Sequence, residues 1–190
     1  DYRLAPEHPF PAAVDDGLSA WRWILERGFA PERVMFGGDS AGGGLVLATL
    51  LRARDEKTAL PAGAMLFSPW SDLTASGASV TSKTGVDPMI PGKSVLVEMA
   101  GHYHSDSTNP LVSPLFADLA GLPPLLIQVG DAELLLDDST RLAERALAAG
   151  VDASLRIWDE APHVFQAIPH LPETAEALTD VGDFFGRHVL

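Results

Sequence analysis

The chain has 190 residues, of which 46% are hydrophobic and 21% are charged, the balance of a globular domain with a sizeable core. Acidic residues outnumber basic ones by 26 to 13, and the net charge of −13 disfavours nucleic acid and anionic membranes as partners. Cysteine is absent, which excludes disulfides, a thiol nucleophile and a thiolate metal site. A cytoplasmic location fits such a chain, and so does secretion without disulfides.

Apolar β-prone runs alternate with helical patterns along the chain, which predicts an α/β fold with a mostly parallel sheet and helices on both faces. Residues 1–7 are expected to be the tail of a strand and a turn, since their prolines block a helix. The run 125–130 is apolar apart from Gln128, as in a strand buried on both faces. In chain order the other expected elements are helix 12–27, strand 33–37, helix 41–54, strand 62–68, helix 138–149, strand 153–158 and helix 173–188.

Residues 69–122 interrupt this alternation with a segment rich in Ser, Thr, Gly and Pro, and with one candidate helix at 93–102. It is too long for a simple connection, so we expect an insertion over the strand ends that contributes to a cap and to the substrate pocket. Trp70 and Phe116 are candidates for the wall of that pocket, with packing in the core as the alternative.

The strongest motif is Gly38-Asp39-Ser40-Ala41-Gly42, a G-x-S-x-G sequence between an expected strand and an expected helix. This context predicts a nucleophile elbow, a tight turn that lifts the Ser40 hydroxyl clear of the sheet at a helix N-terminus. The backbone N–H of Ala41 would then stabilise the oxyanion of a tetrahedral intermediate. The alternative is a glycine-rich turn with an idle serine.

A serine nucleophile needs a base, and in a fold of this type the base is a histidine on a loop after a later strand. His163 fits best because it follows the strand expected to end at Trp158, with a surface histidine as the alternative. The other five histidines are in a proline-rich turn, in the insertion, or near the last helix: His8, His102, His104, His170 and His188. His102-x-His104 lacks a nearby acidic third ligand, so we expect a solvated helix end, and no metal site or cofactor.

The acid that orients the histidine is expected among four carboxylates after the strand 125–130. Asp131 follows the strand too soon, and one of Asp137 and Asp138 is expected to cap the next helix. Glu133 lies in the middle of the loop and is the preferred acid, with Asp137 as the alternative.

At this point the sequence resembles the bacterial hormone-sensitive-lipase-like esterases, a group of carboxylesterases on the α/β-hydrolase fold. The matching runs extend over most of the chain: Asp1 to Ala13, Gly37 to Gly43, Ser68 to Asp72, Leu122 to Pro124, Asp137-Asp138 and Pro162 to Phe165. The resemblance implies hydrolysis of short- to medium-chain esters without a cofactor, with Ser40 as nucleophile and His163 as base. The family's acid is usually an Asp, and the alignment puts Glu133 at its position; the fold accepts either carboxylate.

The family's His-Gly-Gly-Gly motif, which supplies further oxyanion donors, precedes the run that begins here at Tyr2, and it is not in this sequence. The resemblance therefore implies that residues 1–190 are the C-terminal portion of one α/β-hydrolase domain, without its N-terminal strands and cap helices. It implies a small-molecule ester as substrate, and a homodimer through the last strand is a candidate oligomeric state. An amidase or arylformamide hydrolase with the same triad, and a non-catalytic ligand-binding protein on this fold, are the alternatives.

Overall fold

The computed structural model describes residues 1–104 and 106–189 of the chain. Four parallel strands form one sheet in the order β1-β2-β3-β4: β1 (Met35–Asp39), β2 (Gly63–Phe67), β3 (Leu125–Gly130) and β4 (Ala153–Trp158). The α-helices are α1 (Ala12–Glu26), α2 (Ala41–Asp55), α3 (Ser79–Ser82), α4 (Lys93–Tyr103), α5 (Leu136–Ala148) and α6 (Pro172–His188). Single 3₁₀ turns lie at η1 (Pro31–Arg33), η2 (Pro114–Phe116) and η3 (Phe165–Ala167).

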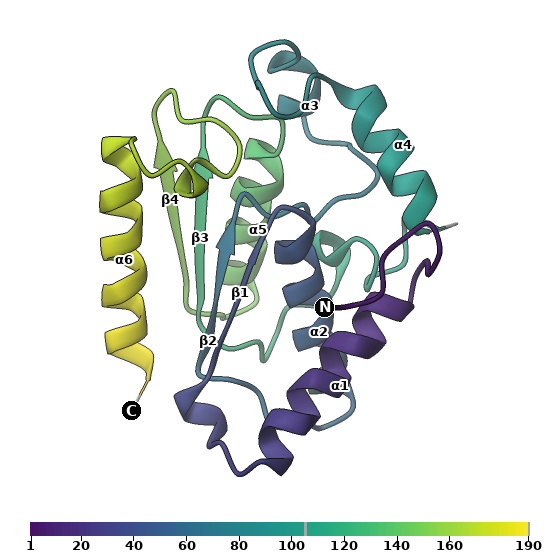
Figure 1. The fold of residues 1–190 in the computed structure, drawn as a ribbon, viewed down its shortest axis with the longest axis vertical. Helices are drawn as coiled ribbons and strands as arrows, with labels where there is room; N and C mark the ends of the chain where they lie inside the picture. Colours follow the sequence, from purple (N-terminus) through teal and green to yellow (C-terminus); the bar gives the residue numbers. More distant parts are fainter. Residues whose placement is uncertain (105, 190) are drawn as a thin grey trace.

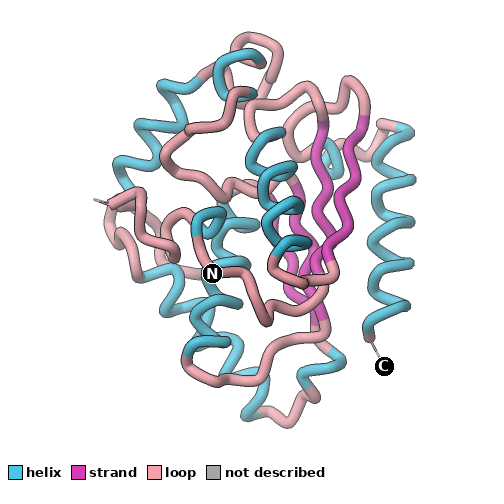
Figure 2. The backbone as a smooth tube through the Cα atoms, turned by 180° about the vertical axis from the view of Figure 1, so that it is seen from behind, coloured by secondary structure: helices cyan, strands magenta, loops and turns pink. Residues whose placement is uncertain are grey.

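The helices lie in two layers on the sheet. Helix α6 covers one face, whereas α1, α2 and α5 lie on the other, as the two opposite views show (Figures 1 and 2). Alternate residues of the strands follow this division: Ile127 packs in the large apolar core with residues of α2 and α5, while Gln128 donates from its side chain to the carbonyl of Ala177 in α6 at 2.9 Å. Every residue of β3 is buried, as expected for a central parallel strand.

The predicted α/β class is confirmed, and β3 and β4 have the predicted bounds. The strand expected in residues 1–7 is wrong: the backbone N–H of Arg3 donates to the carboxylate of Asp16 at 2.8 Å instead of to a neighbouring strand. The capping prediction is also wrong. Leu135 is the N-cap of α5, and Asp137 and Asp138 lie inside its first turn, where their carboxylates accept hydrogen bonds from other segments.

The segment 69–122 is an ordered part of the fold. It carries α3, α4 and η2, and its apolar side chains form a second core together with Leu134 and Leu135, which follow β3. The end of α4 lies against the N-terminal segment, where the backbone N–H of Phe10 donates to the carbonyl of Tyr103 at 2.7 Å (Figure 1). In the described part of the chain, no helix combines the length and apolar character needed to cross a membrane.

Candidate active site

Ser40 occupies the sharp turn between β1 and α2. Its backbone has φ 51° and ψ −120°, a conformation that a residue with a side chain adopts only under strain. The flanking glycines are required by space: a Cβ on Gly38 would lie 2.4 Å from the carbonyl oxygen of Gly42, and one on Gly43 would lie 2.8 Å from Cβ of Pro69. The first glycine of the G-x-S-x-G motif, Gly38, and the glycine just after the motif, Gly43, therefore have a steric cause in this turn, whereas a Cβ on Gly42 would meet no atom within 4 Å.

The end of β2 and the segment that follows it are hydrogen-bonded to the backbone of this turn. The N–H of Ser40 donates to the carbonyl of Phe67 at 2.9 Å, and the N–H of Trp70 donates to the carbonyl of Ser40 at 2.9 Å. Helix α2 then begins at Ala41, whose N–H is among the first four of the helix and so has no acceptor within it. This N–H and the helix dipole favour negative charge beside Ser40.

A buried hydrogen bond joins His163 and Glu133. Nδ1 of His163 lies 3.1 Å from Oε1 of Glu133; the glutamate is fully buried and the histidine is 7% exposed. The second carboxylate oxygen, Oε2, accepts the N–H of Gly130 at 3.1 Å. Gly130 ends β3 in close contact with the histidine loop, since a Cβ there would lie 1.9 Å from the carbonyl oxygen of Ala161. The loop after β3, which carries Glu133, therefore lies against the loop after β4, which carries His163. This contact brings the Glu133 carboxylate to the imidazole.

The other acidic residues of this loop have different partners. Oδ2 of Asp137 accepts the N–H of Ser79 in α3 at 3.0 Å, and Oδ1 of Asp131 accepts the N–H of Glu160 at 2.7 Å. Of the two carboxylates considered as orienting acids, Glu133 is therefore the one hydrogen-bonded to His163 in the structure.

Asp138 is an acidic residue near the site whose pKa lies well above its ordinary value. Its Oδ2 accepts the backbone N–H groups of Ser71 and Asp72, each at 2.8 Å. Burial, together with the nearby charge of Asp72, raises the pKa of Asp138 to about 7. For Asp72, burial acts to raise the pKa, but hydrogen bonds from Ser76, Thr74 and Arg141 outweigh it and lower the pKa below its ordinary value.

Two polar residues near the site were missed by sequence reasoning, Asp138 and Ser68. Asp138 was expected to cap or begin a helix, and Ser68 was expected to end a strand and begin a family-like run. Ser68 is fully buried directly after β2, and its hydroxyl contacts Glu133 at 2.7 Å. A serine at the end of a buried strand, at the edge of the sheet where such sites form, was the available signal.

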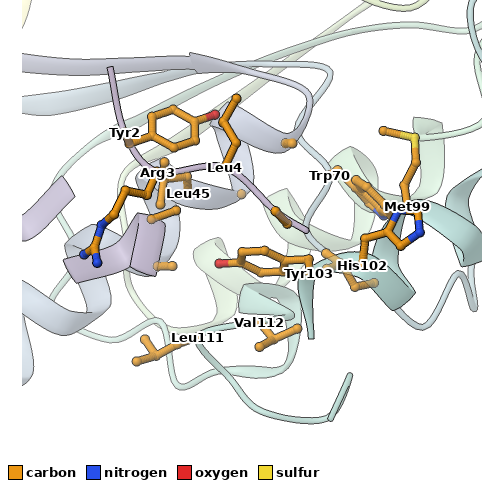
Figure 3. A pocket seen from close by; sticks show the side chains of 16 residues that line it. Tyr2, Arg3, Leu4, Leu45, Trp70, Met99, His102, Tyr103, Leu111 and Val112 are labelled. Carbon is orange, nitrogen blue, oxygen red and sulfur yellow. The ribbon is translucent and has the colours of Figure 1, made fainter. Parts of the chain in front are cut away.

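A cavity of about 330 Å³ is lined by residues of α2, α4 and the N-terminal segment; Ala41, the residue after Ser40, is one of them, whereas Ser40 and His163 are not. Figure 3 shows the aromatic and aliphatic side chains along it, among them Tyr2, Trp70 and Tyr103. Trp70 is both a wall of this cavity and largely buried. The expectation for Phe116 is wrong: it does not line this cavity and is 42% exposed, because η2 turns it outward beside the Arg141 guanidinium.

His102 is exposed in the last turn of α4, and His104 follows the end of that helix. Burial lowers the pKa of His104. Among the described residues, no group of three or more His, Asp or Glu side chains is arranged so that it could hold a metal ion.

Comparison with known proteins agrees with the geometry. Residues 1–167 match a family described as having the alpha/beta hydrolase fold. An acetyl-hydrolase from Streptomyces hygroscopicus is 46% identical over 186 residues, which are 96% of this chain and 62% of that protein. An esterase from Acinetobacter venetianus is 39% identical over 190 residues, again 62% of its length. The chain therefore spans less than two thirds of these relatives.

Among solved structures, the crystal structure of an esterase from the bacterial hormone-sensitive lipase family has a TM-score of 0.97 and 49% sequence identity. The similarity covers 100% of this chain and 65% of that one. The fold, the G-x-S-x-G motif and the similar proteins all indicate the same family. The chain therefore belongs to the α/β-hydrolase fold family and, within it, to the hormone-sensitive-lipase-like esterases.

Proposed function

We propose that the protein is a serine carboxylesterase in which Ser40 is the nucleophile, His163 the general base and Glu133 the acid that orients the base. The observation that carries the proposal is the buried bond between Nδ1 of His163 and Glu133, at the same edge of the sheet as the strained Ser40 turn. Because Nδ1 faces the carboxylate, the imidazole keeps its proton there and leaves Nε2 free to accept a proton.

The reaction then proceeds in two halves. His163 removes the proton of the Ser40 hydroxyl as Oγ attacks the ester carbonyl, and the Ala41 N–H donates to the oxyanion. Collapse of the tetrahedral intermediate breaks the ester bond, and His163 gives its proton to the departing alcohol. Water, deprotonated by His163, attacks the acyl-enzyme; the bond between the acyl group and Oγ of Ser40 then breaks, and His163 returns the proton to Oγ as the acid is released.

The substrate we propose is a small ester with a short- to medium-chain acyl group. A cavity of about 330 Å³, lined in part by Ala41 beside the nucleophile, is large enough for such a group, and its walls include Trp70, Leu45 and Val112. The net charge of −13 favours neutral or cationic substrates over anionic ones.

The test is Ser40→Ala in the full-length protein, assayed with p-nitrophenyl acetate. We expect turnover to fall by about 10⁴-fold or more, because a triad without its nucleophile retains only binding and oxyanion stabilisation. Ser19→Ala is the matched control, since Ser19 lies on the exposed side of α1 and should keep wild-type activity. More than about a tenth of wild-type activity in Ser40→Ala would overturn the assignment of the nucleophile.

A matched pair of substrates tests the ester preference. The p-nitroanilide of the same acyl group should be hydrolysed far more slowly than the p-nitrophenyl ester. Comparable kcat/KM values for the two would identify an amidase instead, and no turnover of either, with binding retained, would indicate a ligand-binding protein.

A further inference from the structure

Ser68 is a buried residue in an unusual backbone conformation. It follows β2 directly, it is fully buried, and its φ is 46°, in the left-handed region that favours glycine. Its own N–H donates to the carbonyl of Gln128 at 2.7 Å, which fixes the turn against β3. Strain of this kind persists only where the surroundings hold it, and it is concentrated at functional sites. Ser40 and Val164 share the feature, with φ of 51° each.

The Ser68 hydroxyl joins two loops. Oγ donates to Oε2 of Glu133 at 2.7 Å and accepts the N–H of Val164 at 3.1 Å. The direction of both bonds is fixed by chemistry, because a carboxylate only accepts and a backbone N–H only donates. One hydroxyl therefore contacts the carboxylate on the loop after β3 and the backbone beside His163 on the loop after β4.

The two oxygens of the Glu133 carboxylate have different partners. Oε1 faces His163, while Oε2 receives the N–H of Gly130 and the hydroxyl of Ser68. Two donors on Oε2, from different directions, resist rotation of the carboxylate about its last bond. Hydrogen bonds to a charged acceptor are stronger than neutral ones, so the orientation that presents Oε1 to the imidazole is held firmly.

The same short segment also holds the nucleophile turn. Phe67, one residue before Ser68, accepts the N–H of Ser40, and Trp70, two residues after it, donates to the carbonyl of Ser40. The segment Phe67 to Trp70 thus contacts all three loops that carry the proposed triad. A shift of this segment would change the relative positions of nucleophile, base and acid together.

We propose that Ser68 is a positioning residue of this triad, whose hydroxyl fixes the Glu133 carboxylate and the His163 loop in one geometry. The inference rests on the proposed esterase function. Ser68 touches no reacting atom; it acts through Glu133 and through the backbone of Val164. Its contribution is pre-organisation, because a displaced base or acid lowers the rate of the chemical steps without weakening substrate binding.

The experiment compares Ser68→Ala with Ser68→Gly in the full-length protein. Both remove the hydroxyl, but glycine also relieves the strain at φ 46°, so it keeps the test valid if the alanine variant folds poorly. We expect kcat for p-nitrophenyl acetate to fall by about 10- to 100-fold in both, with KM changed by less than about threefold. Ser139→Ala is the matched control: Ser139 is also fully buried, and its hydroxyl has no partner among the described residues.

A double-mutant cycle separates positioning from packing. In a Glu133→Ala background, Ser68→Ala should reduce kcat by less than about threefold, because its main partner is already gone. A loss equal to that in the wild-type background would overturn the proposal, and so would a kcat of Ser68→Ala within about twofold of wild type. An equal loss in Ser139→Ala would point to general packing and would overturn it as well. Activity retained in Ser40→Ala, in contrast, would refute the proposed function itself.

Discussion

Replacing Asp138 by Asn should stabilise the protein at neutral and alkaline pH relative to the wild type. Oδ2 of Asp138 accepts two backbone N–H groups, and Oδ1 is buried without a partner in the described part of the chain. Burial, and to a lesser extent the neighbouring Asp72 charge, raise the pKa of Asp138 from 3.8 to about 7, while the hydrogen bonds from the backbone of Asp72 and Ser71 and the charge of Arg141 oppose this. Asparagine keeps an accepting oxygen for both N–H groups and has no charge to bury.

The sign and size follow from proton linkage. A carboxyl whose pKa is higher in the folded state contributes stability that is fully present below the unfolded-state pKa and is lost as the pH rises through the folded-state pKa. The window for Asp138 is therefore about pH 4 to 7, and the rise from 3.8 to about 7 corresponds to at most about 4 kcal/mol. The lowered pKa of Asp72 acts in the opposite sense and below this window, in both proteins.

Urea unfolding of the wild type and Asp138→Asn at several values between pH 4 and 8 measures the difference directly. The free energy of unfolding of the variant, relative to the wild type, should increase from about pH 4 to about pH 7 and then level off. A difference that stays constant, or that moves in favour of the wild type, would show that the folded protein holds Asp138 ionised at no cost.

Two further substitutions test the loops of the site. Glu133→Gln should reduce kcat by about 10³-fold or more, whereas Asp137→Asn should retain most activity; pH–rate profiles of both distinguish them, and the reverse order would reassign the acid. Gly130→Ala should lower both thermal stability and kcat, because its Cβ would lie 1.9 Å from the backbone carbonyl of Ala161 and must displace the loop that carries His163. Unchanged melting temperature and rate in Gly130→Ala would refute the tight approach of these loops.

The sheet could be predicted because its signals are local. Leu125–Gly130 is a short run that is apolar apart from Gln128, and its strand has the predicted bounds because a central parallel strand is mostly apolar on both faces. The start of α5 was misjudged for a local reason as well. An aspartate before a helix resembles a cap, but Asp138 is turned toward the backbone of Ser71 and Asp72, which lie 67 and 66 residues away in sequence.

The residues of the candidate site also fall into those that a local sequence signal could predict and those that it could not. The turn at Ser40 has a recognisable motif, whose first glycine, Gly38, is required by space, and the loop position of Glu133 led to the carboxylate that is hydrogen-bonded to His163. Ser68 could not be found in this way. Its hydroxyl contacts residues that are 65 and 96 positions away, and no spacing along the chain encodes such a meeting.

The strained turns and the buried hydrogen bonds of this site depend on one another. A residue with a side chain pays on the order of 1–3 kcal/mol for a sparsely populated backbone conformation, so three such residues need firm compensation. Ser40, Ser68 and Val164 each have backbone N–H groups that donate to a partner in another loop or strand, and these partners are Phe67, Gln128 and Ser68 itself. Ser68 takes part in two of these bonds: its N–H donates to the carbonyl of Gln128 in β3, and its hydroxyl accepts the N–H of Val164. The Ser68 hydroxyl links the loop of the base to the acid, and the backbone of its neighbours Phe67 and Trp70 links both to the nucleophile turn. Removal of the hydroxyl should therefore lower kcat more than it lowers the stability of the fold.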